Sequence, residues 1–287
     1  MSVNGSRSIN QRRTHADMAE IRAAILEVLA EDRPMTVRQV YYRLTVSGAI
    51  EKTEKEYKTV VRVLTDMRRS GEVPFPWIAD NTRSMRKPYS CPNLESALRD
   101  TVDAYRRSYW DEQPAYVEVW LEKDALSGVF FEVTRVWDVP LMVTRGYPSI
   151  SFLHDAGETI AGNAKRAFLY YFGDHDPSGV DITRAVEEGI REFAPGADVT
   201  LERIAVTEKQ IEAWNLPTRP TKTSDARSKD FDGESVEVDA IPPKTLRGLI
   251  EECICRNIDG KAWTASKRRE RFDRRKLASL LQGREQA

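Results

Sequence analysis

Two aspartates separated by one residue follow a strongly apolar stretch of the chain. Asp174 and Asp176 lie in the segment GDHDPSG (173–179), directly after the apolar run 166–172. Residues two apart in extended backbone project to the same side, so both carboxylates are expected to face one point. Two such carboxylates repel each other unless a cation lies beside them. The alternative is an Asp-rich turn that caps the helix expected after Pro177.

A third acidic residue, Glu122, ends another apolar run, residues 115–121. Alone, such a residue is more often a helix cap than a ligand. Ligands of parallel sheets bind at the carboxyl ends of the strands, so Glu122, Asp174 and Asp176 are expected to converge there. Three hard oxygen donors suit Mg²⁺, which keeps several water molecules and binds a substrate phosphate. His175 is expected to point away by alternation, so we do not count it as a ligand.

The segment RQVYY (38–42) places an arginine one helical turn before a tyrosine. Tyr41 falls on the apolar stripe of the expected helix, whereas Arg38 and Tyr42 share another face. We therefore expect Tyr41 to be structural and Tyr42 to be presented. A tyrosine hydroxyl is a weak nucleophile until a cation favours its phenolate, and Arg38 could supply that charge while binding a phosphate. The alternative is two core tyrosines.

The residues around this tyrosine predict three short helices, at about 17–31, 36–48 and 54–70, because apolar residues recur there at three- and four-residue spacing. Gly71 and the extended VPFPWI that follows predict a small wing. The segment 17–90 is therefore interpreted as a winged helix-turn-helix domain, whose third helix commonly enters the major groove of DNA.

The third predicted helix has an apolar and a basic face. The inward face is expected to consist of Tyr57, Val60, Val61, Leu64 and Met67. The basic residues expected to bind DNA from the outer face are Lys55, Lys58, Arg62 and Arg69. The alternative is that these charges only keep a surface helix soluble.

Strands and helices alternate beyond residue 114, which predicts a mostly parallel sheet covered on both faces. The strands are expected at 115–121, 139–144, 166–172 and 199–206. A linker, 91–114, with an amphipathic helix at roughly 94–110, precedes this second domain, 115–262. The fold class is therefore α/β, with a mostly α N-terminal domain.

The two ends of the chain are basic and its middle is acidic. Residues 1–90 carry 16 Lys and Arg against 11 Asp and Glu, residues 91–262 carry 20 against 31, and residues 263–287 carry 8 against 3. This pattern favours ends that bind a polyanion around a centre that holds metal or develops charge, and the alternative is solvated helices with uneven faces. Residues 1–16 are expected to be a flexible basic arm. Residues 263–287 are expected to be a basic helix that either contacts phosphates or is merely a soluble tail.

The composition excludes several classes of protein. No apolar run approaches the ~20 residues that span a bilayer, so no membrane association is expected. The N-terminus lacks the apolar region of a secretion signal. Three cysteines form neither a disulfide framework nor a zinc motif. We expect a cytoplasmic protein associated with the nucleoid.

Residues 207–250 are less regular. The stretch 218–229 is expected to be an exposed loop, and its basic residues could contact DNA. Glu237 and Asp239 are expected on a short edge strand with both acids outward, and the alternative is that they join the acidic cluster.

Together these motifs resemble the A subunit of DNA topoisomerase VI and the related meiotic double-strand-break transesterase. VRQVYY (37–42) is similar to the nucleophile motif of that family, which implies Tyr42 as the nucleophile and Arg38 as its assistant. TRGYPSISF (144–152) is similar to a Gly-Tyr-Pro segment that precedes the aspartate motif in the family.

The acidic motifs resemble those of the family's Toprim domain. WLEKDALSGVF (120–130) resembles the strand that ends in Glu-Lys, which implies Glu122 as a metal ligand. DHDPSG (174–179) resembles the DxDPxG motif, which implies Asp174 and Asp176 as the other two ligands.

The resemblance implies a winged helix followed by a Rossmann-like Toprim domain, and Mg²⁺-dependent cleavage of double-stranded DNA by transesterification. It also implies a 5′-phosphotyrosyl product and a homodimer in which the tyrosine of one chain meets the metal of the other. The chain most resembles stand-alone mini-A topoisomerases, of type IIB, and control by ATP would require a separate ATPase subunit. The alternatives are a Toprim metal-dependent nuclease of a plasmid or phage defence system, and a non-catalytic DNA-binding protein.

Overall fold

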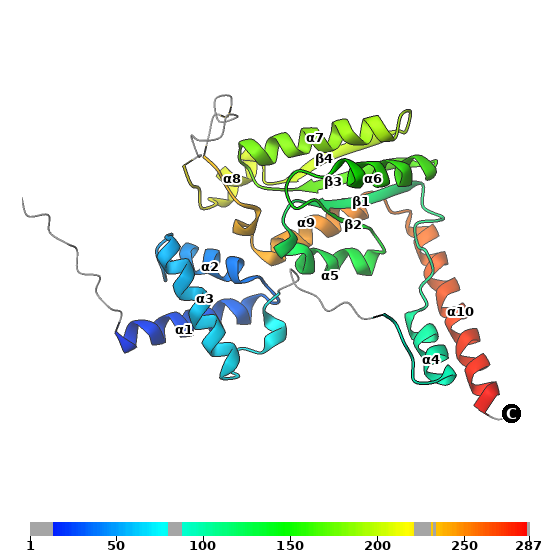
Figure 1. Cartoon of the computed structure of the whole chain (residues 1–287), viewed down its shortest axis with the longest axis horizontal. Coiled ribbons are helices and arrows are strands. Elements are labelled where there is room, and N and C mark those ends of the chain that lie inside the picture. Colours follow the sequence, from blue (N-terminus) through cyan, green and yellow to red (C-terminus); the bar gives the residue numbers. More distant parts are fainter. Residues whose placement is uncertain (1–13, 80–87, 221–230, 232–233, 286–287) are drawn as a thin grey trace, which may run out of the picture. The chain divides into compact units, whose positions relative to one another are not determined.

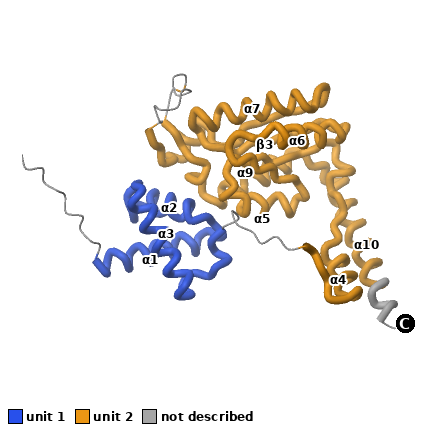
Figure 2. The backbone as a smooth tube through the Cα atoms, viewed as in Figure 1, with its two compact units in different colours: residues 1–79 blue, residues 80–287 orange. Residues whose placement is uncertain are grey.

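The computed structural model describes residues 14–79, 88–220, 231 and 234–285, and the chain divides into two compact units, 1–79 and 80–287 (Figure 2). Most of the predicted arm 1–16 and of the predicted loop 218–229 lies outside the described residues.

The described part of the first unit is helical. Its helices are α1 (His15–Glu31), α2 (Val37–Val46) and α3 (Glu54–Arg69). Each is preceded by a threonine whose side-chain oxygen accepts a hydrogen bond from the backbone N–H three residues on, which is a preferred N-cap. The three predicted helices are therefore confirmed to within two residues at each end.

The inward face of α3 differs in part from the prediction. Val60, Leu64 and Met67 are buried as expected, but Val61 is 38% exposed and Val63 is buried instead. Residues 60, 63, 64 and 67 form one stripe of a 3.6-residue helix, and residue 61 lies at the edge of that stripe.

No β-hairpin wing is present between Gly71 and Ala79. Residues Phe75–Trp77 form a short 3-10 turn, and Ile78 makes one isolated parallel bridge with Met35. The prolines at 74 and 76 carry no N–H to donate to a strand ladder, which explains the turn.

The described part of the second unit contains a four-stranded, all-parallel sheet, as predicted (Figure 1). Its order is β2-β1-β3-β4, with strands β1 (Ala115–Leu121), β2 (Leu141–Val143), β3 (Arg166–Phe172) and β4 (Val199–Ala205). The central strands β1 and β3 are apolar along most of their length, because a parallel strand is buried on both faces.

Helices cover both faces of this sheet (Figure 1). One face packs against α6 (Ile150–Gly162) and α7 (Pro177–Phe193) through a core that includes Trp120 and Tyr171. The other face packs against α5 (Ser127–Trp137) and α9 (Pro243–Cys255), where the rings of Phe130 and Phe172 meet at 5.0 Å.

The remaining described helices are α4 (Leu94–Ala104), α8 (Glu208–Trp214) and α10 (Gly260–Glu285), with 3-10 turns η2 (Asp124–Leu126) and η4 (Val238–Ala240). The helix predicted at 94–110 ends at residue 104, because the next residues contact α10. The Tyr105 hydroxyl donates to Asp273 at 2.9 Å, and the Arg107 N–H donates to Glu270 at 3.0 Å. Among the described helices, none combines the length and apolar character needed to cross a bilayer.

Candidate functional site

The ends of β1 and β3 bring Glu122 and Asp174 together. The register pairs Leu121 with Phe172, so the residues that follow emerge at the same edge of the sheet. The Glu122 N–H continues the ladder by donating to the Phe172 carbonyl at 2.9 Å. The Asp174 N–H then donates to Glu122 Oε2 at 3.0 Å. The convergence expected for these two acids is therefore present.

Two glycines allow this approach. A Cβ atom at Gly173 would lie 2.5 Å from Glu122 Oε2, and one at Gly179 would lie 2.1 Å from the Asp174 carbonyl oxygen. Neither distance is compatible with a side chain. At Gly179 the clash is with backbone, so that glycine is required, whereas at Gly173 the Glu122 and Tyr171 side chains would have to shift.

Asp176 caps a helix, which was the alternative to its predicted role as a metal ligand. It is the N-cap of α7, where its Oδ1 accepts a hydrogen bond from the Gly179 N–H at 2.8 Å. Its other oxygen, Oδ2, lies 3.6 Å from the guanidinium of Arg219. Capping uses only Oδ1, so Oδ2 is left to Arg219 or to a cation, and the capping role does not exclude the role of a ligand.

Lys123 lies at the centre of three carboxylates. Its Nζ is 3.1 Å from Asp174 Oδ2, 3.0 Å from Glu237 Oε2 and 2.7 Å from Asp239 Oδ2. Its side chain is 20% exposed, so these contacts are largely shielded from water. The ammonium group therefore joins the end of β1 to the 237–239 segment.

The expectation that Glu237 and Asp239 point outward from an edge strand is wrong. Both are buried, and Asp239 is 1% exposed. The backbone explains their position: Val236 pairs with His175, and the Val238 N–H donates to Asp174 Oδ1 at 2.8 Å. The alternative, that the two acids join the acidic cluster, is the correct one.

His175, which was not expected to be a ligand, packs inside the protein. It is buried, and its ring lies 5.1 Å from that of Phe231. Burial lowers the pKa of this imidazole, which favours its neutral form.

Burial and mutual repulsion shift the pKa values of the acidic residues. Burial raises the pKa of Glu122 to about 7, and the charge of Asp174 adds to that rise. Burial also raises the pKa of Asp174, although Lys123 opposes the change. Burial opposes the charge of Lys123, but the carboxylates of Asp239, Asp174 and Glu237 outweigh it and raise the pKa of its ammonium group. Lys123 is therefore a permanent cation.

Arg203 is a further residue that the sequence did not single out. Its guanidinium donates to the backbone carbonyls of Gly173 at 3.2 Å and Gly179 at 2.9 Å, and also to that of Asp174. These hydrogen bonds hold the backbone that joins β3 to α7 in place beside the carboxylates.

Negative charge exceeds positive charge among the described side chains that meet here. Counted as fully ionised, five carboxylates face three cations, a formal excess of two negative charges that is complete only above the pKa of Glu122, about 7. The carboxylates are Glu122, Asp174, Asp176, Glu237 and Asp239. The cations are Lys123, Arg203 and Arg219.

The donor chemistry and charge of this cluster fit a divalent cation that prefers oxygen, such as Mg²⁺. In the arrangement described, however, no three Asp, Glu, His or Cys side chains already form a metal cage. Both oxygens of Asp174 already have partners in the protein. Its Oδ2 forms an ion pair with Lys123, and its Oδ1 accepts a hydrogen bond from the Val238 N–H. A metal would share these oxygens, since each has two lone pairs.

Tyr41 is buried as expected, but the expectation that Tyr42 is presented is wrong, and the alternative of two core tyrosines describes the structure. Tyr42 is 6% exposed and Tyr41 is 7% exposed, and their rings meet at 5.4 Å. The helix α2 is short and packs against both α1 and α3, so more than one stripe of it is buried. Arg38 places its guanidinium carbon 5.6 Å from the ring centre of Tyr57.

The four basic residues predicted to bind DNA are exposed on α3. Lys58 makes an ion pair with Glu54 at 3.8 Å in which both side chains are about three-quarters exposed. An ion pair of this kind contributes little to stability, so it leaves the lysine available to a phosphate.

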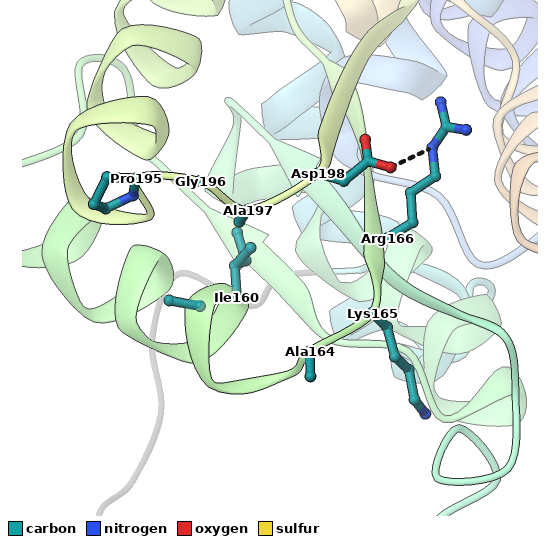
Figure 3. A pocket seen from close by; sticks show the side chains of 9 residues that line it. Ile160, Ala164, Lys165, Arg166, Pro195, Gly196, Ala197 and Asp198 are labelled. Carbon is teal, nitrogen blue, oxygen red and sulfur yellow. Dashed lines mark ion pairs between the residues drawn. The ribbon is translucent and has the colours of Figure 1, made fainter.

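A hollow of about 350 Å³ lies at the other edge of the sheet (Figure 3). It is lined by residues 160–161, 164–166 and 195–198, which end α6 and lead into β3 and β4. Two of the lining residues, Arg166 and Asp198, form an ion pair at 3.6 Å, which Figure 3 marks with a dashed line. Because it lies at the amino ends of the strands, it is separate from the acidic residues.

No protein-family model matches the chain, and no curated protein sequence matches it. The functional assignment therefore depends on the chemistry of the site.

Proposed function

We propose that this protein cleaves double-stranded DNA in a reaction that depends on Mg²⁺ held by Glu122, Asp174 and Asp176. The observation that carries this proposal is the meeting of these carboxylates at the carboxyl ends of parallel strands, with two negative charges in excess. Bound there, Mg²⁺ would supply Lewis-acid chemistry to the scissile phosphate and stabilise the leaving oxygen.

The proposed nucleophile is Tyr42, by the resemblance of its motif. Its phenolic oxygen would form a bond to phosphorus as the bond from phosphorus to the deoxyribose 3′ oxygen breaks. The phenolic proton would pass to water, and water would return a proton to the leaving 3′ oxygen. The products would be a 5′-phosphotyrosyl link and a free 3′-hydroxyl. Arg38, one turn earlier on α2, would stabilise the phenolate and bind the phosphate.

Cleavage of both strands would require two such sites, which a two-fold symmetric homodimer provides. We propose that Tyr42 of one chain then works with the carboxylates of its partner. ATP control would be supplied by a separate ATPase subunit, and the setting would be the nucleoid in the cytoplasm.

The burial of Tyr42 favours a second candidate. A phenol that is 6% exposed must become accessible before it can attack DNA, whereas a single water molecule is small enough to enter a site in which the Asp176 side chain is 22% exposed. The second candidate is therefore a metal-dependent nuclease in which water is the nucleophile and Tyr42 is structural.

Incubation with supercoiled plasmid and Mg²⁺, followed by denaturation, distinguishes these reactions. Transesterification predicts DNA covalently attached to the wild type and none attached to Tyr42→Phe. Cutting that survives Tyr42→Phe but is lost in Asp174→Ala indicates hydrolysis. Asp155→Ala, which removes an exposed acid on α6, is the control expected to cut normally. Absence of any cutting contradicts both candidates and leaves a DNA-binding protein.

A further inference from the structure

The helix α10 has two chemically different faces. Its inner face packs against α4 (Figure 1). The same face carries Trp263, whose ring lies 4.7 Å from that of Tyr109. Glu270 and Asp273 both lie on this inner face, where they accept hydrogen bonds from the Arg107 N–H and the Tyr105 hydroxyl. These are the acidic residues of the helix between residues 260 and 279.

Two arginines at the borders of the inner face are used in its packing. Arg274 lies 3.3 Å from Glu270 and donates to the Tyr105 carbonyl at 2.5 Å. Arg269 pairs with Glu112. These basic side chains are therefore neutralised within the protein.

The outer face carries only positive charge among the side chains described. Arg268, Arg271 and Arg275 fall at i, i+3 and i+7, so they share one stripe of the helix. All three are exposed, and no ion pair joins them to a described acidic residue. Lys261 extends the stripe by two turns. A solvated helix face ordinarily mixes both signs of charge, so this segregation calls for an anionic partner.

We propose that this outer face of α10 is a second contact for duplex DNA, separate from α3, and that its arginines bind phosphates of the backbone. This inference rests on the proposed function, because DNA is the substrate there. The stripe from Lys261 to Arg275 is about 21 Å long at 1.5 Å per residue, which matches several phosphates along one strand. Duplex DNA carries one negative charge per ~1.7 Å of its axis, so it supplies enough charge for the whole stripe.

Binding of the full-length protein to a short duplex, measured by fluorescence anisotropy in EDTA so that no cutting occurs, tests the proposal. The variant Arg268→Gln/Arg271→Gln/Arg275→Gln should bind more weakly, and its slope of log Kd against log salt should fall by roughly 2 to 3. This value follows from a slope of about 0.9 for each phosphate contact in B-DNA. Because the three side chains are exposed, the variant should melt like the wild type.

The matched control is Arg184→Gln/Arg191→Gln/Arg256→Gln. It removes the same formal charge from α7 and from the C-cap of α9, where each arginine has an acidic partner. Its salt slope should stay within roughly one of the wild type.

Three outcomes overturn the proposal. The triple variant could keep the salt slope of the wild type, the control could lose as much slope as the variant, or the loss could occur with duplex RNA and not with DNA. Failure of the proposed function is distinguishable, because the wild type would then bind duplex DNA yet cut it under no condition.

Discussion

Lys123 neutralises a buried carboxylate that has no other described cation beside it. The side chain of Asp239 is fully buried, and its Oδ2 lies 2.7 Å from Lys123 Nζ. Removing one partner of a buried pair leaves an uncompensated charge, which is far more costly than losing an exposed ion pair.

We predict that Lys123→Met lowers the free energy of unfolding by about 3–5 kcal/mol. Methionine keeps the length of the side chain and removes its charge. Urea denaturation measures the change, and Lys209→Met, at an exposed position on α8, is the control. Adding Asp239→Asn should recover part of the loss, since the unpaired charge is then removed. A loss below about 1 kcal/mol would mean that Lys123 is in effect a surface residue.

Glu122 should make the stability of the metal-free protein depend on pH. Its folded-state pKa is raised from 4.5 to about 7, so between these values the folded chain holds a proton that the unfolded chain has released. Stability therefore falls as pH rises through this window. The loss is on the order of 3 kcal/mol, from 1.36 kcal/mol per pKa unit.

We predict that Glu122→Gln reduces this fall in EDTA, because glutamine does not titrate. Urea denaturation at a series of pH values checks it. Saturating Mg²⁺ should also flatten the wild-type profile if the cation binds ionised Glu122. Identical profiles for wild type and Glu122→Gln would show that Glu122 ionises normally in the folded protein.

At the scale of elements, the turn from β3 into α7 depends on the absence of a side chain at Gly179. An added Cβ would meet the Asp174 carbonyl, which is backbone and cannot move aside. We predict that Gly179→Ala destabilises the protein by about 1–3 kcal/mol, as overpacking does. Gly248→Ala on the exposed side of α9, where nothing lies within 4 Å, should instead stabilise it by about 0.5–1 kcal/mol. Thermal or urea unfolding measures both, and equal effects would show that the turn can relax.

The central strands were predictable residue by residue. Both 115–121 and 166–172 are apolar runs that match β1 and β3, and β2 is shorter than the predicted 139–144 because its ladder begins only at Leu141. The local sequence pattern was sufficient to predict these two strands. A strand that is buried on both faces is a nearly continuous apolar run, which differs clearly from the pattern of a half-exposed helix.

Other elements depended on contacts that local sequence does not contain. Tyr42 is buried because α2 has neighbours on two sides, whereas periodicity indicates only one apolar stripe. Glu237 and Asp239 have the spacing of an exposed edge strand, and only the pairing of Val236 with His175 brings them to Lys123. Sequence therefore located Glu122 and Asp174 correctly but missed the cation between the carboxylates.

At the scale of the whole molecule, charge is sorted by position. Five acidic residues of the second unit gather at the carboxyl ends of its strands, and exposed basic residues lie along α3 and the outer face of α10. Under the proposed function, the basic helices would hold the polyanion and the acidic residues would bind the cation.

Binding of a divalent cation by Glu122, Asp174 and Asp176 is the claim on which the proposed reaction depends. A titration of the full chain with Mn²⁺ in the absence of DNA, followed by electron paramagnetic resonance, measures it directly. The wild type and Asp155→Asn should bind Mn²⁺ equally, and Asp174→Asn should bind it roughly 100-fold more weakly or worse, beyond the effect of losing an outer-shell partner. Equal Mn²⁺ affinity in the wild type and Asp174→Asn, or no binding by the wild type, would contradict the claim.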